Sequence, residues 1–267
     1  MFKHAVVGVD FSASWPRLRQ RVELLRQWGL ERATLVYVMS SRYPAVPEEQ
    51  HRPWYEQRLQ ESVNEMSAPD LQLDWEIRTG EPGAVLVEAA RARQADLVLI
   101  GSRGYSRFHE FFVGSTALDV ARLAQTALWL EPAGEAAVKA PQTMLLATDG
   151  SQAGAAAETA FATLSPLTKR ALAVTVIEPD HDTVRVRADA SDHLAELVAS
   201  GTTVESRLVE GDPRHALREV AQHEQADLMV IGQRGRNPIQ QLLLGSVAEA
   251  ACRGMEIPVL LVPQQGS

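Results

Sequence analysis

The fold is decided by the stretch ADLVLIGSRG at residues 95–104, which returns as ADLMVIGQRG at residues 226–235. In each copy an apolar run ends in a Gly-x-x-Gly loop, and nine residues separate that loop from a Gly-Ser pair, at 114–115 and again at 245–246. Both features lie 131 residues apart, from 101 to 232 and from 114 to 245. A spacing kept without a gap indicates two copies of one structural unit in tandem.

The beginnings of the two copies also correspond, and they set the expected limits of each domain. VGVDFS at residues 7–12 matches LATDGS at 146–151, at an offset of 139 (10 to 149). The second copy is therefore eight residues shorter (139 − 131) between its first strand and its glycine loop. The stretch PAGEAAVKAP between the copies is small and turn-prone, as linkers are. We expect one domain at 1–132 and a second at 141–267.

Each copy alternates short apolar runs with longer segments of helical period. In the first copy the runs cover residues 5–9, 33–38 and 97–100, and the first helical segment places Leu18 and Val22 on one face. The arginines of that segment are expected to point outward: Arg17, Arg19, Arg21 and Arg26. Alternation of this kind gives parallel strands joined by right-handed crossovers, with helices on both faces of the sheet. We expect an α/β protein of two tandem, Rossmann-like, doubly wound domains.

Composition narrows the classes of partner. The chain is 45% hydrophobic and 22% charged, and its formal net charge of −8 argues against nonspecific binding to nucleic acid or to an anionic membrane. No apolar run reaches the roughly 18 to 20 residues that cross a bilayer, and the first run is too short for a signal peptide. We expect a cytoplasmic protein with no membrane contact. The single cysteine, Cys252, excludes an internal disulfide and a cysteine-based metal site, and is expected to be buried.

The topology brings the polar and glycine-rich positions of each copy to one rim. Asp10 and Asp149 end the first strands, and Gly101 and Gly232 end the fourth. In doubly wound sheets, ligands bind outside the carboxyl ends of the strands, at the point where the strand order reverses. We therefore expect each aspartate and its glycine loop to border one binding cleft.

The glycine loop suits phosphate. Glycine lets the backbone approach an anion, and the Gly-Ser pair opens a helix whose free N–H groups favour negative charge. Ser115 or Ser246 can cap that helix and donate to a phosphate oxygen. A plainer alternative stays open, in which Gly-Ser is only a turn and a cap, and Asp10 and Asp149 are only helix N-caps. Arg103 and Arg234 either pair with phosphates or face water.

Several other chemistries lack their motifs. No lysine follows the loop as in the Gly-x4-Gly-Lys-Ser/Thr phosphate loop, and Gly-x-Gly-x-x-Gly does not follow either first strand. No Gly-x-Ser-x-Gly marks a nucleophile elbow. The seven histidines do not pair with carboxylates at metal-ligand spacing, and His181, between two aspartates, is interpreted as part of a solvated turn. Fast catalysis is not expected.

The motifs together resemble those of the universal stress protein family, over both halves of the chain. The resemblance implies a five-stranded parallel sheet flanked by helices in each domain, and ATP as the ligand, with or without Mg. Asp10 and Asp149 would contact the adenosine, and the backbones of Val38 and Val176 would flank the adenine. The phosphates would lie on two sets of loop residues: Gly101, Gly104, Gly114 and Ser115 in copy one, and Gly232, Gly235, Gly245 and Ser246 in copy two. The resemblance also implies pairing of the two domains as an internal pseudo-dimer, through 128–130 and 259–262, and association into a homodimer.

The two copies do not follow the family pattern equally. Copy two has Asp149-Gly150-Ser151 and a proline before its last strand. Copy one has Phe11 after its aspartate, and its loop spacer holds several large side chains: Tyr105, Phe108, His109, Glu110, Phe111 and Phe112. These aromatics would crowd a ligand and Glu110 would repel phosphate, so copy two is the better ATP site.

Three functions are compatible with these features. The first is an ATP- or adenine-nucleotide-binding stress-response regulator that acts on an unidentified protein partner and is not an enzyme, beyond slow ATP hydrolysis. The second is an interaction or scaffold protein of the same fold with degenerate, nucleotide-free clefts. The third is an ATP-using enzyme of the related adenine-nucleotide α-hydrolase class. The extra residues of copy one, 40–66 with Trp54 and Tyr55, either cover its cleft or meet a partner.

Overall fold

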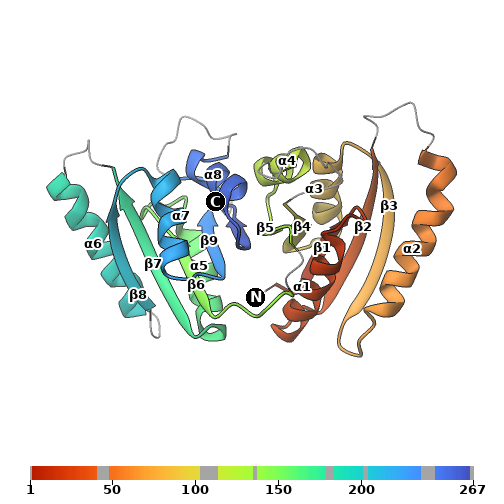
Figure 1. Cartoon of the computed structure of the whole chain (residues 1–267), viewed down its shortest axis with the longest axis horizontal. Coiled ribbons are helices and arrows are strands. Elements are labelled where there is room, and N and C mark those ends of the chain that lie inside the picture. The colour runs from red at the N-terminus through yellow and green to blue at the C-terminus, as the bar shows by residue number, and fades with distance from the viewer. Residues whose placement is uncertain are drawn as a thin grey trace. The chain divides into compact units, whose positions relative to one another are not determined.

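A computed structural model describes residues 2–40, 48–102, 114–134, 137–178, 183–200, 204–235 and 244–264. The chain divides into two compact units, Met1–Lys139 (unit 1) and Ala140–Ser267 (unit 2). Figure 1 labels the helices and strands of both.

Unit 1 alternates strands and helices along the chain. Its elements are β1 (His4–Val9), α1 (Trp15–Gln27), β2 (Arg32–Ser40), the 3-10 turn Glu48–His51, α2 (Arg52–Glu65), β3 (Gln72–Gly80), α3 (Pro82–Ala92), β4 (Leu97–Gly101), α4 (Ser115–Leu123) and β5 (Ala127–Glu131). The strands lie in the order β3-β2-β1-β4-β5 and every pair is parallel.

Unit 2 repeats this plan. Its elements are β6 (Thr143–Ala147), α5 (Ala155–Leu164), the 3-10 turn Ser165–Leu167, β7 (Arg170–Ile177), α6 (Thr183–Ser200), β8 (Val204–Glu210), α7 (Pro213–His223), β9 (Leu228–Gly232), α8 (Ser246–Gly254) and β10 (Val259–Val262). The strand order is β8-β7-β6-β9-β10, again parallel.

The expected fold class is therefore confirmed, with five parallel strands in the described part of each unit. In both sheets the strand order reverses beside the first strand, between β1 and β4 and between β6 and β9. Because crossovers are right-handed, α1 and α2 cover one face of the first sheet while α3 and α4 cover the other. The Arg19–Glu65 ion pair (2.6 Å) joins α1 to α2, and Figure 1 shows helices on both sides of each sheet.

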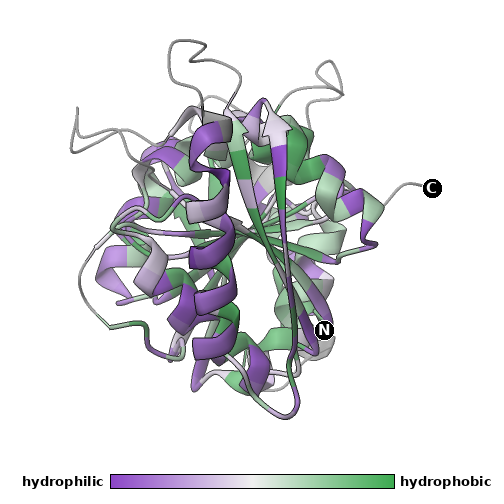
Figure 2. Ribbon diagram, turned by 90° about the vertical axis from the view of Figure 1, so that its right-hand side faces the viewer, coloured by the Kyte–Doolittle hydropathy of each residue, from purple (hydrophilic) through white to green (hydrophobic). Residues whose placement is uncertain are grey.

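Burial follows strand position. Residues at the centre of β1, β4 and β6 are fully buried and apolar, because helices cover both faces of these strands. The outer strands β3 and β8 consist mainly of exposed and half-buried positions instead. In Figure 2 the helix nearest the viewer, α2, is mostly hydrophilic, while hydrophobic residues are frequent in the strands behind it.

The repeat extends to backbone details. Both α3 and α7 start at a proline, Pro82 and Pro213, where a missing N–H costs no helical hydrogen bond. Both helices are followed by a glutamine in the left-handed region, Gln94 at φ 51° and Gln225 at φ 52°. These residues lie 131 positions apart, so the offset read from the glycine loops also holds here.

One expectation for α1 was wrong. Arg21 does not point outward: its side chain is 2% exposed and its Nε donates to Glu131 at the end of β5 (2.8 Å). Arg17 also donates to Glu131 (2.8 Å), as does the indole of Trp129 (3.1 Å), and the Arg21 guanidinium lies 4.8 Å from the centre of that indole ring. A buried carboxylate needs such partners, which is why two arginines turn towards the sheet.

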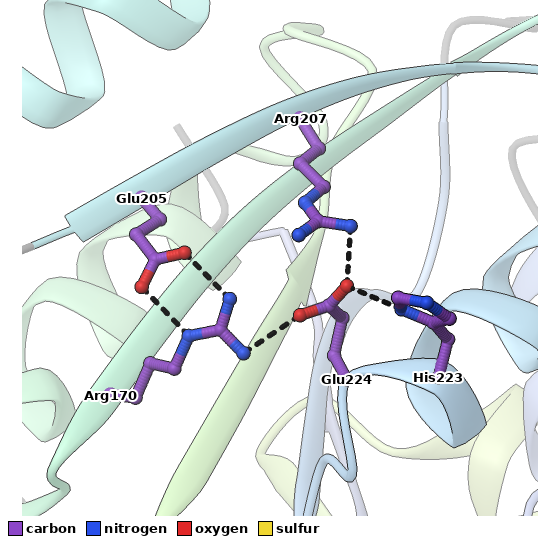
Figure 3. A network of polar contacts seen from close by, with 5 residues as sticks. All are labelled: Arg170, Glu205, Arg207, His223 and Glu224. Carbon is purple, nitrogen blue, oxygen red and sulfur yellow. Dashed lines mark hydrogen bonds and ion pairs between the residues drawn. The ribbon is translucent and has the colours of Figure 1, made fainter.

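Ion pairs tie the end of α3 or α7 to the outer strand in each unit. In unit 1, Arg93 pairs with Asp74 and, at 3.0 Å, with Glu76. In unit 2, 131 positions later, Glu224 takes the place of Arg93 and Arg207 takes the place of Glu76. These two residues form an ion pair whose charges are the reverse of those in unit 1. Figure 3 shows the unit 2 network, in which Arg170 contacts Glu224 (2.7 Å) and Glu205 (2.6 Å), and His223 contacts Glu224 (2.8 Å).

None of the helices in the described ranges combines the length and the apolar character that a bilayer crossing requires.

Candidate functional site

The aspartate loops of the two units share one backbone geometry. The backbone N–H of Ser12 donates to Asp10 Oδ1 at 2.9 Å, and that of Ser151 donates to Asp149 Oδ1 at the same distance. Each aspartate thus closes a turn on the residue two positions on. Neither is a helix N-cap, because Ser14 and Gly154 hold those positions. The N-cap explanation of these aspartates is therefore wrong.

The glycine loops begin where the fourth strands end, at Gly101 of β4 and Gly232 of β9. The next helices have Gly114 and Gly245 as N-caps, whose backbone N–H groups donate to Ser102 (2.9 Å) and Gln233 (3.0 Å). Ser115 and Ser246 are the first helical residues and do not hold the cap position. The cap falls one residue earlier than expected because the glycines adopt the extended conformation that an N-cap requires.

In unit 2 the aspartate loop and the glycine loop touch. A Cβ placed on Gly235 would lie 2.8 Å from Asp149 Oδ2, and one on Gly232 would lie 3.1 Å from the carbonyl oxygen of Arg234. A side chain at Gly235 would meet the Asp149 carboxylate and one at Gly232 would crowd the backbone of its own loop, so glycine at both positions favours this approach. The switch point of the sheet therefore brings Asp149, Gly232, Gly235 and Gly245 to one place.

The valines lie on the neighbouring strands. Val38 lies on β2 and Val176 on β7, both in the carboxyl-terminal halves of these strands and both half-buried. Gly104, Arg103 and the spacer residues 105–112 lie outside the described residues, as do His181 and residues 236–243.

Unit 2 also carries buried polar atoms at this rim, and of their residues sequence reasoning had named only Arg234 as a possible phosphate contact. Ser151 Oγ, Thr175 Oγ1 and Arg234 Nε are buried and have no hydrogen-bond partner within the described residues. Thr175 is 5% exposed and lies one residue before Val176, while Ser151 and Arg234 belong to the two loops that meet. Buried polar atoms are nearly always hydrogen-bonded, so three such atoms at one rim fit a site that receives a polar ligand.

A second polar group supports the Asp149 loop from the side. His193 of α6 contacts Glu158 of α5 (Nε2 to Oε1, 2.8 Å), and Thr148 donates to the same carboxylate oxygen. Thr148 in turn accepts the backbone N–H of Gly150 at 3.1 Å. A Cβ on Gly150 would lie 3.2 Å from the His193 ring, so the imidazole rests directly on this loop.

Unit 1 differs at the positions that correspond to this polar set. Ser12 Oγ, the counterpart of Ser151 Oγ, has a partner in Ser14 Oγ at 3.1 Å. Phe11 replaces Gly150, and Tyr37 replaces Thr175. The backbone of the loop is thus repeated while its side chains are not.

The fold and this rim define a tandem protein of two doubly wound α/β units, each with an aspartate loop and the end of its fourth strand at the switch point. Residues 1–130 and residues 141–263 each match the Universal stress protein family. The chain therefore belongs to the universal stress protein family and is a stress-response protein of that family, as its motifs predicted.

Individual relatives are distant. A universal stress protein of Methanocaldococcus jannaschii is 37% identical over 62 residues, which make up 23% of this chain and 36% of that protein. One of Mycobacterium bovis is 29% identical over 198 residues, 68% of this chain and 66% of that protein. The crystal structure of a universal stress protein from Archaeoglobus fulgidus DSM 4304 aligns with a TM-score of 0.80 over 98% of both chains, at 18% identity, which concerns the fold alone.

The chain spans less than half the length of several curated relatives, with shares of 36%, 46%, 44% and 38%.

Proposed function

We propose that this stress-response protein binds an adenine nucleotide, ATP first, in the cleft of unit 2. The observation that carries the proposal is the set of buried, unpartnered polar atoms within the described residues, on Ser151, Thr175 and Arg234, beside the point where Asp149 meets Gly235. A ligand with a polar base and phosphates would supply partners to all three atoms.

The residues of unit 2 have distinct roles in this proposal. Asp149 contacts the adenosine and the backbone of Val176 flanks the adenine. Gly232, Gly235, Gly245 and Ser246 surround the phosphates, at the N-terminal end of α8, where free N–H groups and the helix dipole favour an anion. Over the described ranges, no group of three or more His, Cys, Asp or Glu could hold a metal ion, so Mg would enter on the phosphates.

We propose a regulatory role, with no catalysis beyond slow ATP hydrolysis. The His193 imidazole rests on the Asp149 loop, and its Nε2 contacts the carboxylate of Glu158 and not a hydroxyl or thiol nucleophile. Nucleotide occupancy would then bias a conformation that a protein partner recognises. The internal pairing of the two domains, a homodimer and a cytoplasmic location belong to the same proposal.

The second candidate function is an interaction or scaffold protein without nucleotide. The observation that favours it is the aromatic cluster of unit 1, where Phe11, Tyr37, Trp54 and Tyr55 contact one another beside the loop of Asp10. Unit 2 lacks this cluster at the matching positions, so the scaffold function applies more readily to unit 1.

The test compares alanine variants at two glycines of unit 2. Equilibrium binding of ATP is measured for each, with GTP and cyclic AMP as competing ligands. In Gly235→Ala the new methyl group meets Asp149 Oδ2, whereas a Cβ on Gly254 has no heavy atom within 4 Å. We expect Gly235→Ala to weaken ATP binding at least tenfold, which corresponds to about 1.4 kcal/mol. The matched control, Gly254→Ala, should bind as the wild type does.

Mass spectrometry of nucleotide released from freshly purified protein identifies the natural ligand. If the wild type neither releases a nucleotide nor takes up millimolar ATP, the scaffold function replaces the proposal.

A further inference from the structure

We propose that Phe11 closes the candidate cleft of unit 1 from within, so that unit 1 takes no nucleotide and the chain has one nucleotide site, in unit 2. The statement about unit 2 rests on the proposed function. The statement about Phe11 rests on the contacts of unit 1 and can be tested without any nucleotide.

The backbone places Phe11 at a position that favours glycine. Its φ is 52°, in the left-handed region, and the corresponding Gly150 has a φ of 69°. The preceding aspartates close the same turn in both units, so the two positions coincide in the loop. A phenylalanine held in this conformation needs compensating contacts, because a side chain disfavours the left-handed region.

The ring of Phe11 has those contacts. It stacks on Tyr37 with 5.8 Å between ring centroids and 26° between planes. Tyr37 stacks in turn on Tyr55 of α2, at 4.0 Å and 23°. The rings of Trp15 and Trp54 meet Phe11 edge-on, at 6.2 Å and 5.9 Å. Aromatic side chains from β2, α1 and α2 therefore converge on the ring of Phe11.

A cation completes the cluster. The guanidinium carbon of Arg58 lies 5.2 Å from the centre of the Phe11 ring and 5.5 Å from that of Trp54. A planar ring with an aromatic neighbour stacked on it and a cation over it has the environment in which proteins hold a ligand base. In unit 1 that ring belongs to the chain itself.

The polar groups agree with this assignment. The hydroxyl of Ser12 is bonded to Ser14 in unit 1, whereas the corresponding hydroxyl of Ser151 has no partner within the described part of unit 2. Tyr37 occupies the stack in unit 1, whereas the matching Thr175 leaves a buried, unpartnered hydroxyl in unit 2. Beside the Asp10 loop of unit 1, the hydroxyl of Ser12 has a partner within the unit. Beside the Asp149 loop of unit 2, the hydroxyls of Ser151 and Thr175 have none within the described residues.

The first experiment measures how many ATP molecules the full chain binds. We expect one per chain in the wild type, and a single site of at least tenfold lower affinity in Gly235→Ala. The double variant Phe11→Gly/Tyr37→Thr gives unit 1 the residues that unit 2 has at these two positions, and we expect the number of ATP molecules bound per chain to rise from one to two. Two ATP molecules in the wild type, or a double variant that stays at one, would overturn the proposal.

The second experiment tests the position of Phe11 without a nucleotide. It therefore separates failure of the Phe11 proposal from failure of the nucleotide proposal if the wild type binds no nucleotide. Phenol, a free planar ring, is added to the wild type and to the double variant, and thermal unfolding is followed. If Phe11 fills the cleft, phenol raises the Tm of the double variant and leaves that of the wild type unchanged, because only the variant offers space for a ring. An equal response of both proteins would overturn the assignment of Phe11. A cooperative unfolding transition in each variant shows that it is folded.

Discussion

Phe11 illustrates how a single residue can separate two copies of one motif. The left-handed conformation costs a non-glycine residue roughly 1–2 kcal/mol, and aromatic contacts in unit 1 offset that cost. In unit 2 glycine adopts the same conformation freely and the neighbouring groups remain polar. The difference between the two clefts therefore originates in side chains that lie on an unchanged backbone.

The buried pair of Arg21 and Glu131 makes a prediction at the same scale. Arg21→Met leaves the fully buried Glu131 with fewer donors, and removing one partner of a buried ion pair costs about 3–5 kcal/mol. Because Arg17 and Trp129 still donate to this carboxylate, we expect a loss of about 3 kcal/mol in the free energy of unfolding, at the lower end of that range. Urea titration measures this loss.

Arg19 of the same helix is the matched control. It pairs with Glu65 on the surface, where an ion pair contributes roughly 0–1 kcal/mol, so Arg19→Met should change stability little. Equal losses from the two variants would contradict the buried role of Arg21.

Sequence reasoning failed at Arg21 for a physical reason. Helical periodicity separates an apolar face from a polar one, and an arginine on the boundary is assigned to water. The partner that draws Arg21 inward lies 110 residues away, at the end of β5, and no local pattern connects the two. His193 was missed in the same way, because its contact with Glu158 joins two helices 35 residues apart.

At the scale of elements, the ion pair of Arg93 with Glu76 returns in unit 2 with its charges reversed, as Glu224 with Arg207. Glu224→Arg would place a cation beside Arg170 and Arg207, and we expect it to lower the Tm more than Arg253→Ala, which breaks an exposed pair within α8. Glu224→Arg/Arg207→Glu copies the arrangement of Arg93 and Glu76 in unit 1. We expect the double variant to recover most of the loss, and no recovery would show that the pair does not couple α7 to β8.

The same network predicts a dependence on pH. The hydrogen bond from Arg170 lowers the pKa of Glu224 below its ordinary value of 4.5, and it lowers the pKa of Glu205 as well. A carboxylate whose pKa is lower in the folded state stabilises the fold above the unfolded pKa, and this contribution is lost as the pH falls through the folded pKa. We therefore expect the Tm difference between wild type and Glu224→Gln to shrink below about pH 4.5.

Elements were the scale at which the sequence was most informative. Strands β1, β4, β6 and β9 are short apolar runs bounded by polar or glycine residues, and their alternation with helices is enough to predict a parallel sheet. The approach of Asp149 to Gly235 also followed from topology, because both end strands at one rim. The side-chain contents of the two clefts did not follow, because they depend on helices α2 and α6 packing over the rim.

At the scale of the whole molecule, two units of one fold are predicted to respond differently to one ligand. With ATP at about 100 times its Kd, a single site stabilises the folded state by about 2.7 kcal/mol. Hydrogen exchange should then slow in the aspartate and glycine loops of unit 2, around Asp149 and Gly235, and stay unchanged around Asp10. Equal protection of both units would show that unit 1 also takes the ligand.

The reversed ion pairs have a further consequence while the chain folds. Two similar units in one chain risk exchanging equivalent helices, since α3 and α7 fit the same place on similar sheets. Docked on β8, α3 would bring Arg93 against Arg207, and docked on β3, α7 would bring Glu224 against Asp74 and Glu76. Glu205 takes the place of Asp74 in unit 2 and would still attract Arg93, so these charges oppose the docking of α7 on β3 more strongly than that of α3 on β8.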